Sequence, residues 1–121
     1  MTLKILAVDD SHTMRSMIKM ALAEADFEVH LAEDGLDGLK VLEGLSPDVI
    51  LTDINMPNMD GFGFIEAVRK QDALRDVPIL TLTTESAKEM KQRARDAGAT
   101  GWITKPFDRE KLIAVIRKVA A

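Results

Sequence analysis

Several short apolar segments of this 121-residue chain each end directly before a polar residue that can take part in chemistry. The segments span residues 4–8, 49–52, 78–82 and 101–104, and the residues that follow them are Asp9, Asp10, Asp53, Thr83 and Lys105. Short, continuous apolar runs rich in β-branched residues are typical of strands that are buried on both faces of a parallel sheet. Because ligands of an open parallel sheet bind outside the carboxyl ends of its strands, we expect these side chains to converge at one edge.

Helical patterns alternate with these segments along the whole chain. Residues 28–32 alternate and are expected to form an edge strand, and residues 13–24 and 36–42 are expected to be helices, the second capped by Asp34. Three further helices are indicated by the apolar stripe Phe62, Ile65 and Val68, by a capping box at Ser86–Glu89 in a helix ended by Gly98, and by Asp108 as an N-cap. This alternation predicts one α/β domain over residues 1–121, with a five-stranded parallel sheet in the order 2-1-3-4-5 and helices on both faces.

The composition argues against several classes of protein. The chain has no cysteine, which excludes disulfides and thiolate metal sites. Its formal net charge of −4 argues against nucleic acid as a direct partner. Neither a signal peptide nor an apolar run of membrane-spanning length is apparent, so we expect no membrane insertion and a cytoplasmic location. The chain stops directly after the last expected helix, so we expect no output domain.

The acidic residues at the expected sheet edge form a candidate metal site. Taken alone, Asp9 and Asp10 are equally well explained as caps of the following helix. Asp53 changes this interpretation, because three carboxylates brought together repel one another unless a cation lies among them. A set of oxygen ligands without histidine or cysteine favours Mg²⁺. Lys105 follows a strand and is expected to reach Asp53 or a phosphoryl oxygen.

Four segments of the chain resemble the motifs of response-regulator receiver domains, and the likeness is strongest to the family's single-domain chemotaxis members. These segments are residues 8–11, 53–61 (with Met-Pro-Asn-Met-Asp-Gly), 82–85 and 105–107 (Lys-Pro-Phe), in the family's order and spacing. The resemblance covers essentially the whole chain and implies the flavodoxin-like receiver fold.

The resemblance also implies the chemistry of the site. Asp53 would accept a phosphoryl group, and Thr83 and Lys105 would contact its oxygens. Mg²⁺ would be held by Asp10, by Asp53 and by the main-chain carbonyl of Asn55, with Asp9 acting largely through bound water.

Other positions would tune or transmit the signal. Asn55, Thr84 and Glu85 would set the lifetime of the phosphoryl group, and Thr84 departs from the small residue that is common at its position. Trp102 occupies the position of the family's switch aromatic, and with Lys88 and Lys91 it would belong to the surface that a partner recognises.

The resemblance implies a monomeric signalling switch that dephosphorylates itself, not a turnover enzyme. Its phosphoryl donor would be the phosphohistidine of a sensor histidine kinase, with a chemotaxis kinase favoured, and a flagellar motor switch protein or a phosphatase is expected as a further partner. An alternative is a phosphate sink or phosphorelay intermediate that binds no motor. A metal-dependent aspartyl phosphatase is disfavoured, because those enzymes need a second aspartate at the position of Asn55.

Overall fold

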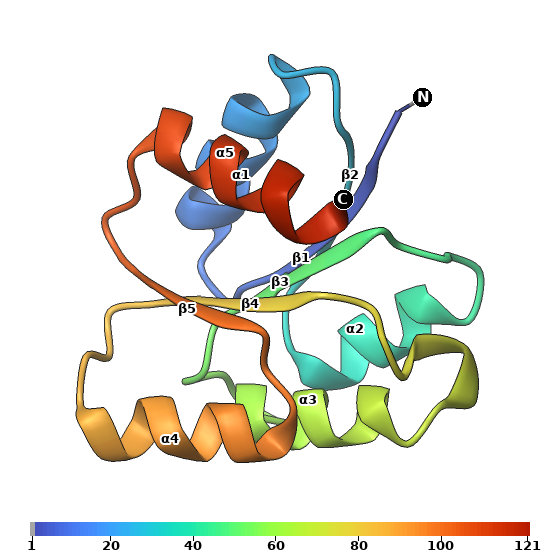
Figure 1. The fold of residues 1–121 in the computed structure, drawn as a ribbon, viewed down its shortest axis with the longest axis vertical. Coiled ribbons are helices and arrows are strands. Elements are labelled where there is room, and N and C mark those ends of the chain that lie inside the picture. Colours follow the sequence, from blue (N-terminus) through green and yellow to red (C-terminus); the bar gives the residue numbers. More distant parts are fainter. Residues whose placement is uncertain (1) are drawn as a thin grey trace.

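All five strands pair in parallel, in the order β2-β1-β3-β4-β5 (Figure 1). The structure is a computed structural model and describes residues 2–121. The strands are β1 (Lys4–Val8), β2 (Glu28–Ala32), β3 (Val49–Thr52), β4 (Ile79–Thr83) and β5 (Gly101–Thr104). The fold class and the strand order that the sequence predicts are therefore confirmed.

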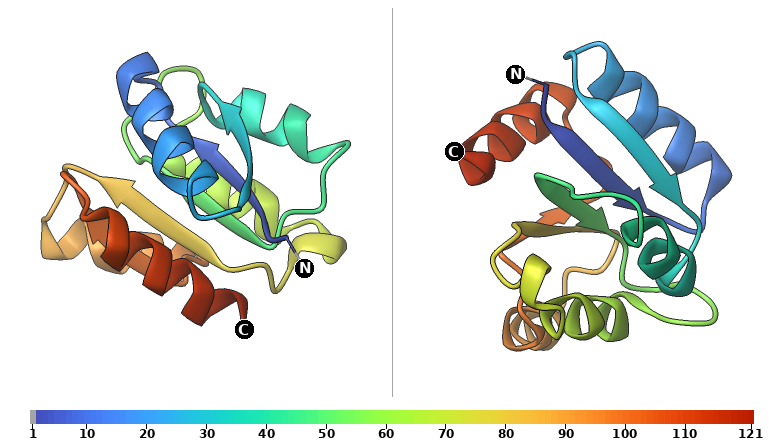
Figure 2. Two further views of the ribbon diagram at one scale, coloured as in Figure 1. Left: turned by 90° about the horizontal axis from the view of Figure 1, so that it is seen from above. Right: turned by 90° about the vertical axis from the view of Figure 1, so that its right-hand side faces the viewer.

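Helices cover both faces of the sheet (Figures 1 and 2). One face carries α1 (His12–Ala23) and α5 (Arg109–Ala120), and the other carries α2 (Gly35–Leu42), α3 (Gly61–Arg69) and α4 (Lys88–Ala97). A short 3₁₀ helix at Asp72–Leu74 was not predicted. Within residues 2–121, none of the helices has the length and apolar character needed to cross a membrane.

The alternation of side chains along β1 divides the core into two layers. Ile5 and Ala7 pack under α1 and α5, whereas Leu6 and Val8 pack against the opposite helices. This division follows from the period of two residues along a strand, which points neighbouring side chains to opposite faces. Both layers need apolar residues, which explains why the central strands appear in the sequence as uninterrupted apolar runs.

Two expectations about the strands are wrong in detail. The segment 101–104 was expected to be buried on both faces, but β5 is half-exposed. It lies at an edge of the sheet, and the helix beside it, α4, buries a single residue, Ala94, so it covers the strand incompletely. The fourth strand begins at Ile79, one residue after Pro78, and continues through Thr83. Proline has no N–H to donate to the sheet, which is consistent with this later start.

The helix ends show which capping predictions hold. Asp34 and Asp108 are N-caps, as predicted, and accept hydrogen bonds from main-chain N–H groups in the first turns of α2 and α5. The capping box at Ser86–Glu89 is wrong: α4 follows Ala87, and no side chain caps it. Ser86 lies one residue before the capping position, so its hydroxyl is displaced from the first turn.

The C-terminal end of α4 is held by a different contact. Gly98 ends the helix with φ 120°, as its residue type predicts. Its carbonyl accepts hydrogen bonds from Nε and Nη2 of Arg69 at 3.0 and 2.8 Å. The same guanidinium donates to the carbonyls of Leu74, Arg75 and Val77. Arg69 therefore ties the ends of α3 and α4 to the chain that enters β4.

Candidate functional site

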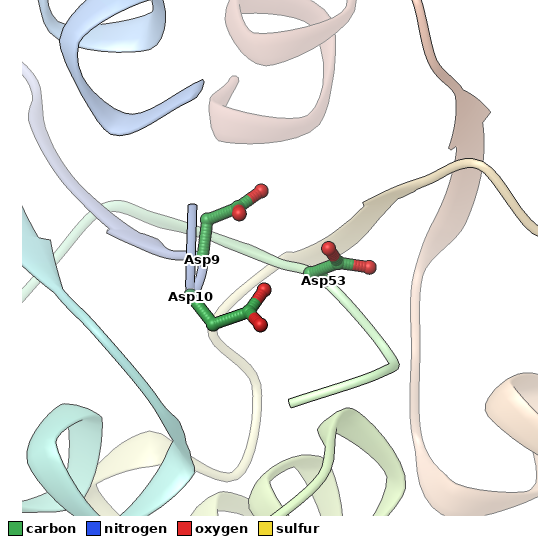
Figure 3. Close-up of side chains that lie close together, drawn as sticks. All are labelled: Asp9, Asp10 and Asp53. Carbon is green, nitrogen blue, oxygen red and sulfur yellow. The ribbon is translucent and has the colours of Figure 1, made fainter. Parts of the chain in front are cut away.

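Three carboxylates lie together where β1 and β3 end (Figure 3). Asp9 and Asp10 follow β1, Asp53 follows β3, and one oxygen from each lies within 4.8 Å of the others. Asp9 and Asp53 are buried, with 1% and 8% of their surfaces exposed, whereas Asp10 is exposed. The convergence expected from the sequence is therefore present in the structure.

The main chain holds two of these aspartates in line with the sheet. The Asp9 N–H donates to the carbonyl of Ala32 at 3.0 Å, and the Asp53 N–H donates to the carbonyl of Val8 at 2.9 Å. Each bond continues the pairing of the strands by one residue, so the main chain of both aspartates is held as firmly as the strands themselves. Rigid placement favours a site that must hold several charges at defined distances.

Lys105 lies between two of the carboxylates. Its Nζ donates to Oδ2 of Asp9 at 2.6 Å and to Oδ2 of Asp53 at 2.9 Å. Contact with Asp53 was expected, but contact with Asp9 was not. Burial alone would lower the pKa of Lys105, but the hydrogen bonds to Asp9 and Asp53 outweigh burial and raise this pKa. The amine is therefore protonated at neutral pH and neutralises part of the acidic cluster.

The other oxygen of each buried carboxylate accepts a main-chain hydrogen bond. Oδ1 of Asp9 accepts from the N–H of Ser11 at 2.9 Å, and Oδ1 of Asp53 accepts from the N–H of Ile54 at 2.6 Å. The metal ligands that the three aspartates offer are all carboxylate oxygens, which suits a hard divalent cation. One lysine does not balance three carboxylates, so the cluster retains negative charge that such a cation would offset.

Glu85 connects three of the residues that were singled out from the sequence. Its main-chain N–H donates to Oγ1 of the buried Thr83 at 3.3 Å, and its carbonyl accepts from Nε1 of Trp102 at 3.0 Å. Its carboxylate accepts from Nδ2 of Asn55 at 2.8 Å. Sequence reasoning placed Glu85 near the site but missed this connecting position, which depends on how the loop after β4 folds.

The remaining candidates lie on the exposed surface, and the sequence reasoning did not predict two residues that hold the main chain of the site. Thr84 is exposed in the loop after β4, and Lys88 and Lys91 are exposed on α4. The guanidinium of Arg15 donates to the carbonyl of Asp9 at 2.6 Å, and the hydroxyl of Ser11 caps α1. A serine directly after the acidic pair is a usual N-cap signal, whereas the Arg15 contact has no signature in the sequence.

Comparison with known proteins agrees with this geometry. Residues 5–117 match the family model described as the response regulator receiver domain. The chain is 44% identical to the chemotaxis response regulator CheY4 of Vibrio cholerae, with a TM-score of 0.93 and coverage of 98% of this chain and 99% of that one. The protein belongs to the response regulator receiver family.

Two sensor kinases contain similar domains. The chain is 37% identical over 116 residues to the sensor histidine kinase CheAY of Helicobacter pylori, an alignment that covers 94% of this chain and 14% of the kinase. The receiver domain of a Pseudomonas aeruginosa sensor histidine kinase is 28% identical, with a TM-score of 0.92 and coverage of 99% and 98%, and is described with a magnesium ion coordinated in its active site cleft. The chain thus spans a small part of the curated kinase that it matches.

Gly61 offers a test of how tightly the main chain of Asp53 is packed. A Cβ at Gly61 would collide with the carbonyl of Asp53 and would lie 2.8 Å from the Cα of Ile54. We predict that Gly61→Ala lowers the free energy of unfolding by about 2 kcal/mol, because these main-chain atoms cannot move aside cheaply. Gly44→Ala is the matched control, because a Cβ there meets nothing within 4 Å. Urea denaturation of both variants is the measurement, and equal stabilities would contradict the prediction.

Proposed function

We propose that Asp53 accepts a phosphoryl group from the phosphohistidine of a sensor kinase. The observation that carries this proposal is the buried Asp53 carboxylate, which is paired with Lys105 beside Asp9 and Asp10. A carboxylate oxygen of Asp53 attacks phosphorus, and the phosphorus–nitrogen bond to the imidazole of the donor breaks. Such a transfer depends mainly on positioning and on neutralising charge, and this site provides both.

Mg²⁺ fits the oxygen donors of the site, and Asp10, Asp53 and the carbonyl of Asn55 would hold it, with Asp9 acting through water. When bound, Mg²⁺ would supply positive charge next to the phosphoryl oxygens. Lys105 supplies positive charge from the opposite side. The hydroxyl of Thr83 accepts a bond from Glu85 and keeps its own proton for donation to a phosphoryl oxygen.

Hydrolysis of the acyl phosphate would return the protein to its initial state. Water attacks phosphorus, and the bond to the Asp53 oxygen breaks, which regenerates the carboxylate and releases phosphate. We assign Asn55, Thr84 and Glu85 to control of this step. The hydrogen bond between Asn55 and Glu85 supports this assignment, because it joins the two loops that border the phosphoacceptor.

The signal would leave the site through Thr83. A move of its hydroxyl toward the phosphoryl group weakens the bond that it accepts from Glu85, and Glu85 in turn holds the indole of Trp102. The loop after β4 and the surface of α4, β5 and α5 then change together, including Lys88, Lys91 and Trp102. A partner that binds this changed surface would stabilise the conformation that phosphorylation favours and so shift the population toward it.

Chemotaxis is the setting that the relatives favour. The likeness to CheY4 supports a chemotaxis kinase as donor and a flagellar motor switch protein or a phosphatase as further partners of a monomeric switch. The likeness to a segment of the kinase CheAY favours a second candidate, in which the protein takes phosphoryl groups from a kinase as a sink or relay.

The phosphoacceptor is testable by intact-protein mass spectrometry. Incubation with acetyl phosphate and Mg²⁺ should add one phosphoryl group to the protein, and Asp53→Asn should remove the adduct because an amide is not a nucleophile here. Asp72→Asn is the control, since that carboxylate is 92% exposed and belongs to a surface pair. Equal labelling of the Asp53→Asn variant would refute the assignment.

The path through Thr83 is testable by fluorescence, because Trp102 is the sole tryptophan and the chain has no tyrosine. Beryllofluoride with Mg²⁺, a mimic of the phosphoryl group, should shift the emission to the blue as the indole becomes more buried. Thr83→Ala should reduce this shift, whereas Thr84→Ala, which alters the exposed neighbour, should keep it. An emission maximum that stays fixed in the wild type would remove Trp102 from the mechanism.

The two candidate functions differ in what binds the protein. As a motor-binding switch, the beryllofluoride-treated protein should retain a motor switch protein in a pull-down, and the untreated protein should retain much less. As a sink or relay, both forms should retain kinase components and neither should retain a motor protein. Motor binding that is equal in the two forms would contradict a phosphorylation-dependent switch.

A further inference from the structure

A nearly buried carboxylate outside the acidic cluster connects two loops at the same end of the sheet. Asp34 lies before α2 and is 6% exposed. Its Oδ1 accepts from the N–H of Asp37 at 2.8 Å, and its Oδ2 accepts from Nδ2 of Asn58 at 2.7 Å. The first bond caps α2, whereas the second reaches the loop between β3 and α3. Two hydrogen bonds lower the pKa of Asp34: the main-chain bond from Asp37 has the larger effect, and the side-chain bond from Asn58 has the smaller. Asp34 is therefore ionised at neutral pH.

A main-chain contact reinforces this connection at the next residue of each loop. The N–H of Gly35 donates to the carbonyl of Met59 at 3.2 Å. A Cβ at Gly35 would lie 2.6 Å from Cγ of Met59, so the close approach of the two loops requires glycine. Asn58 has φ 67°, a conformation that asparagine tolerates better than most residues. The C-terminal part of the β3–α3 loop is thus held against the start of α2 by two successive residues.

The held loop begins with the proposed phosphoacceptor and metal ligands. Asp53 and Asn55 are its first and third residues, and the N–H of Gly61 at its far end donates to the carbonyl of Ile54 at 2.8 Å. A cap alone would not require a buried carboxylate, because serine caps a helix equally well and costs less to bury. The second oxygen of Asp34 therefore has a use beyond the helix, and its partner lies in the loop that carries Asn55.

We propose that Asp34 is a positioning residue for metal binding: its hydrogen bond to Asn58 fixes the β3–α3 loop so that the carbonyl of Asn55 is available to Mg²⁺. This inference rests on the proposed function. Groups that orient metal ligands from outside the coordination shell commonly change metal affinity by about 10–100-fold when they are removed. Without the bond, the loop must be ordered at the moment when the ion binds, and affinity falls.

An isosteric exchange separates this role from capping. Asp34→Asn keeps Oδ1 as the cap of α2 but places an NH₂ group where the charged acceptor faced Asn58, so the original bond is lost and only a weaker, uncharged contact can replace it if the Asn58 amide flips. Asn58→Asp alone sets two carboxylates against each other. The double variant Asp34→Asn/Asn58→Asp restores a donor and an acceptor across the contact and leaves the net charge unchanged.

The measurement is isothermal titration calorimetry of the unphosphorylated full chain with MgCl₂. We expect each single variant to bind Mg²⁺ about tenfold more weakly and the double variant to return toward wild-type affinity. Asp37→Asn controls for loss of one negative charge in the same helix, and it should bind nearly as the wild type does. Urea denaturation of each variant shows whether affinity changes apart from stability.

Each result supports or overturns the inference. Weak Mg²⁺ binding by Asp34→Asn, with affinity restored in the double variant, supports the inference. If Asp34→Asn fails to fold, Asn58→Gly removes the same hydrogen bond while it tolerates the positive φ. Equal weakening by Asp34→Asn and Asp37→Asn would assign the effect to charge and overturn it, as would unchanged affinity in all variants. If the wild type itself bound no Mg²⁺, the proposed function would fail together with this inference.

Discussion

The ion pairs of Lys105 are the interaction on which the site depends. Two buried carboxylates at one sheet edge would each carry a large desolvation cost if left unpaired, and the amine between Asp9 and Asp53 offsets this cost. The lysine follows β5, while the acids follow β1 and β3, so the contact joins three strands across the carboxyl edge of the sheet. The same amine faces the place where new negative charge would arrive. Under the proposed function, one side chain would serve both to stabilise the unphosphorylated site and to recognise the phosphoryl group.

The strand order explains why the functional groups meet at this place. In the order β2-β1-β3-β4-β5, the chain leaves β1 toward one side of the sheet and leaves β3 toward the other, so the two loops open a space between them. The contacts of Glu85 and of Asp34 lie in the loops that surround this space. Rigid strands thus fix the charged groups, and hydrogen bonds between loops determine how the surroundings can move.

The sequence predicts the parts of the molecule that depend on local pattern. Apolar runs locate β1 and β3 because buried parallel strands need apolar residues on both faces, and family motifs locate the acids and Lys105. The same reasoning failed at Ser86, where the helix starts later than the capping pattern indicates, and at β5, where an edge position leaves the strand half-exposed. Contacts between loops, such as Lys105 with Asp9 or Asp34 with Asn58, join residues far apart in the sequence, and no local pattern records them.

The two ends of α4 are held unequally. Arg69 grips the carbonyl of Gly98 at the end farther from the site, whereas no side chain caps the end beside Ala87. The first N–H groups of a helix have no partner within it, so an uncapped first turn opens at lower cost than a clamped last turn. The first turn of α4, next to the loop that contains Glu85, is therefore the end of the helix that is easier to rearrange, while Met90 and Ala94 pack the middle of the helix into a cluster with Phe62.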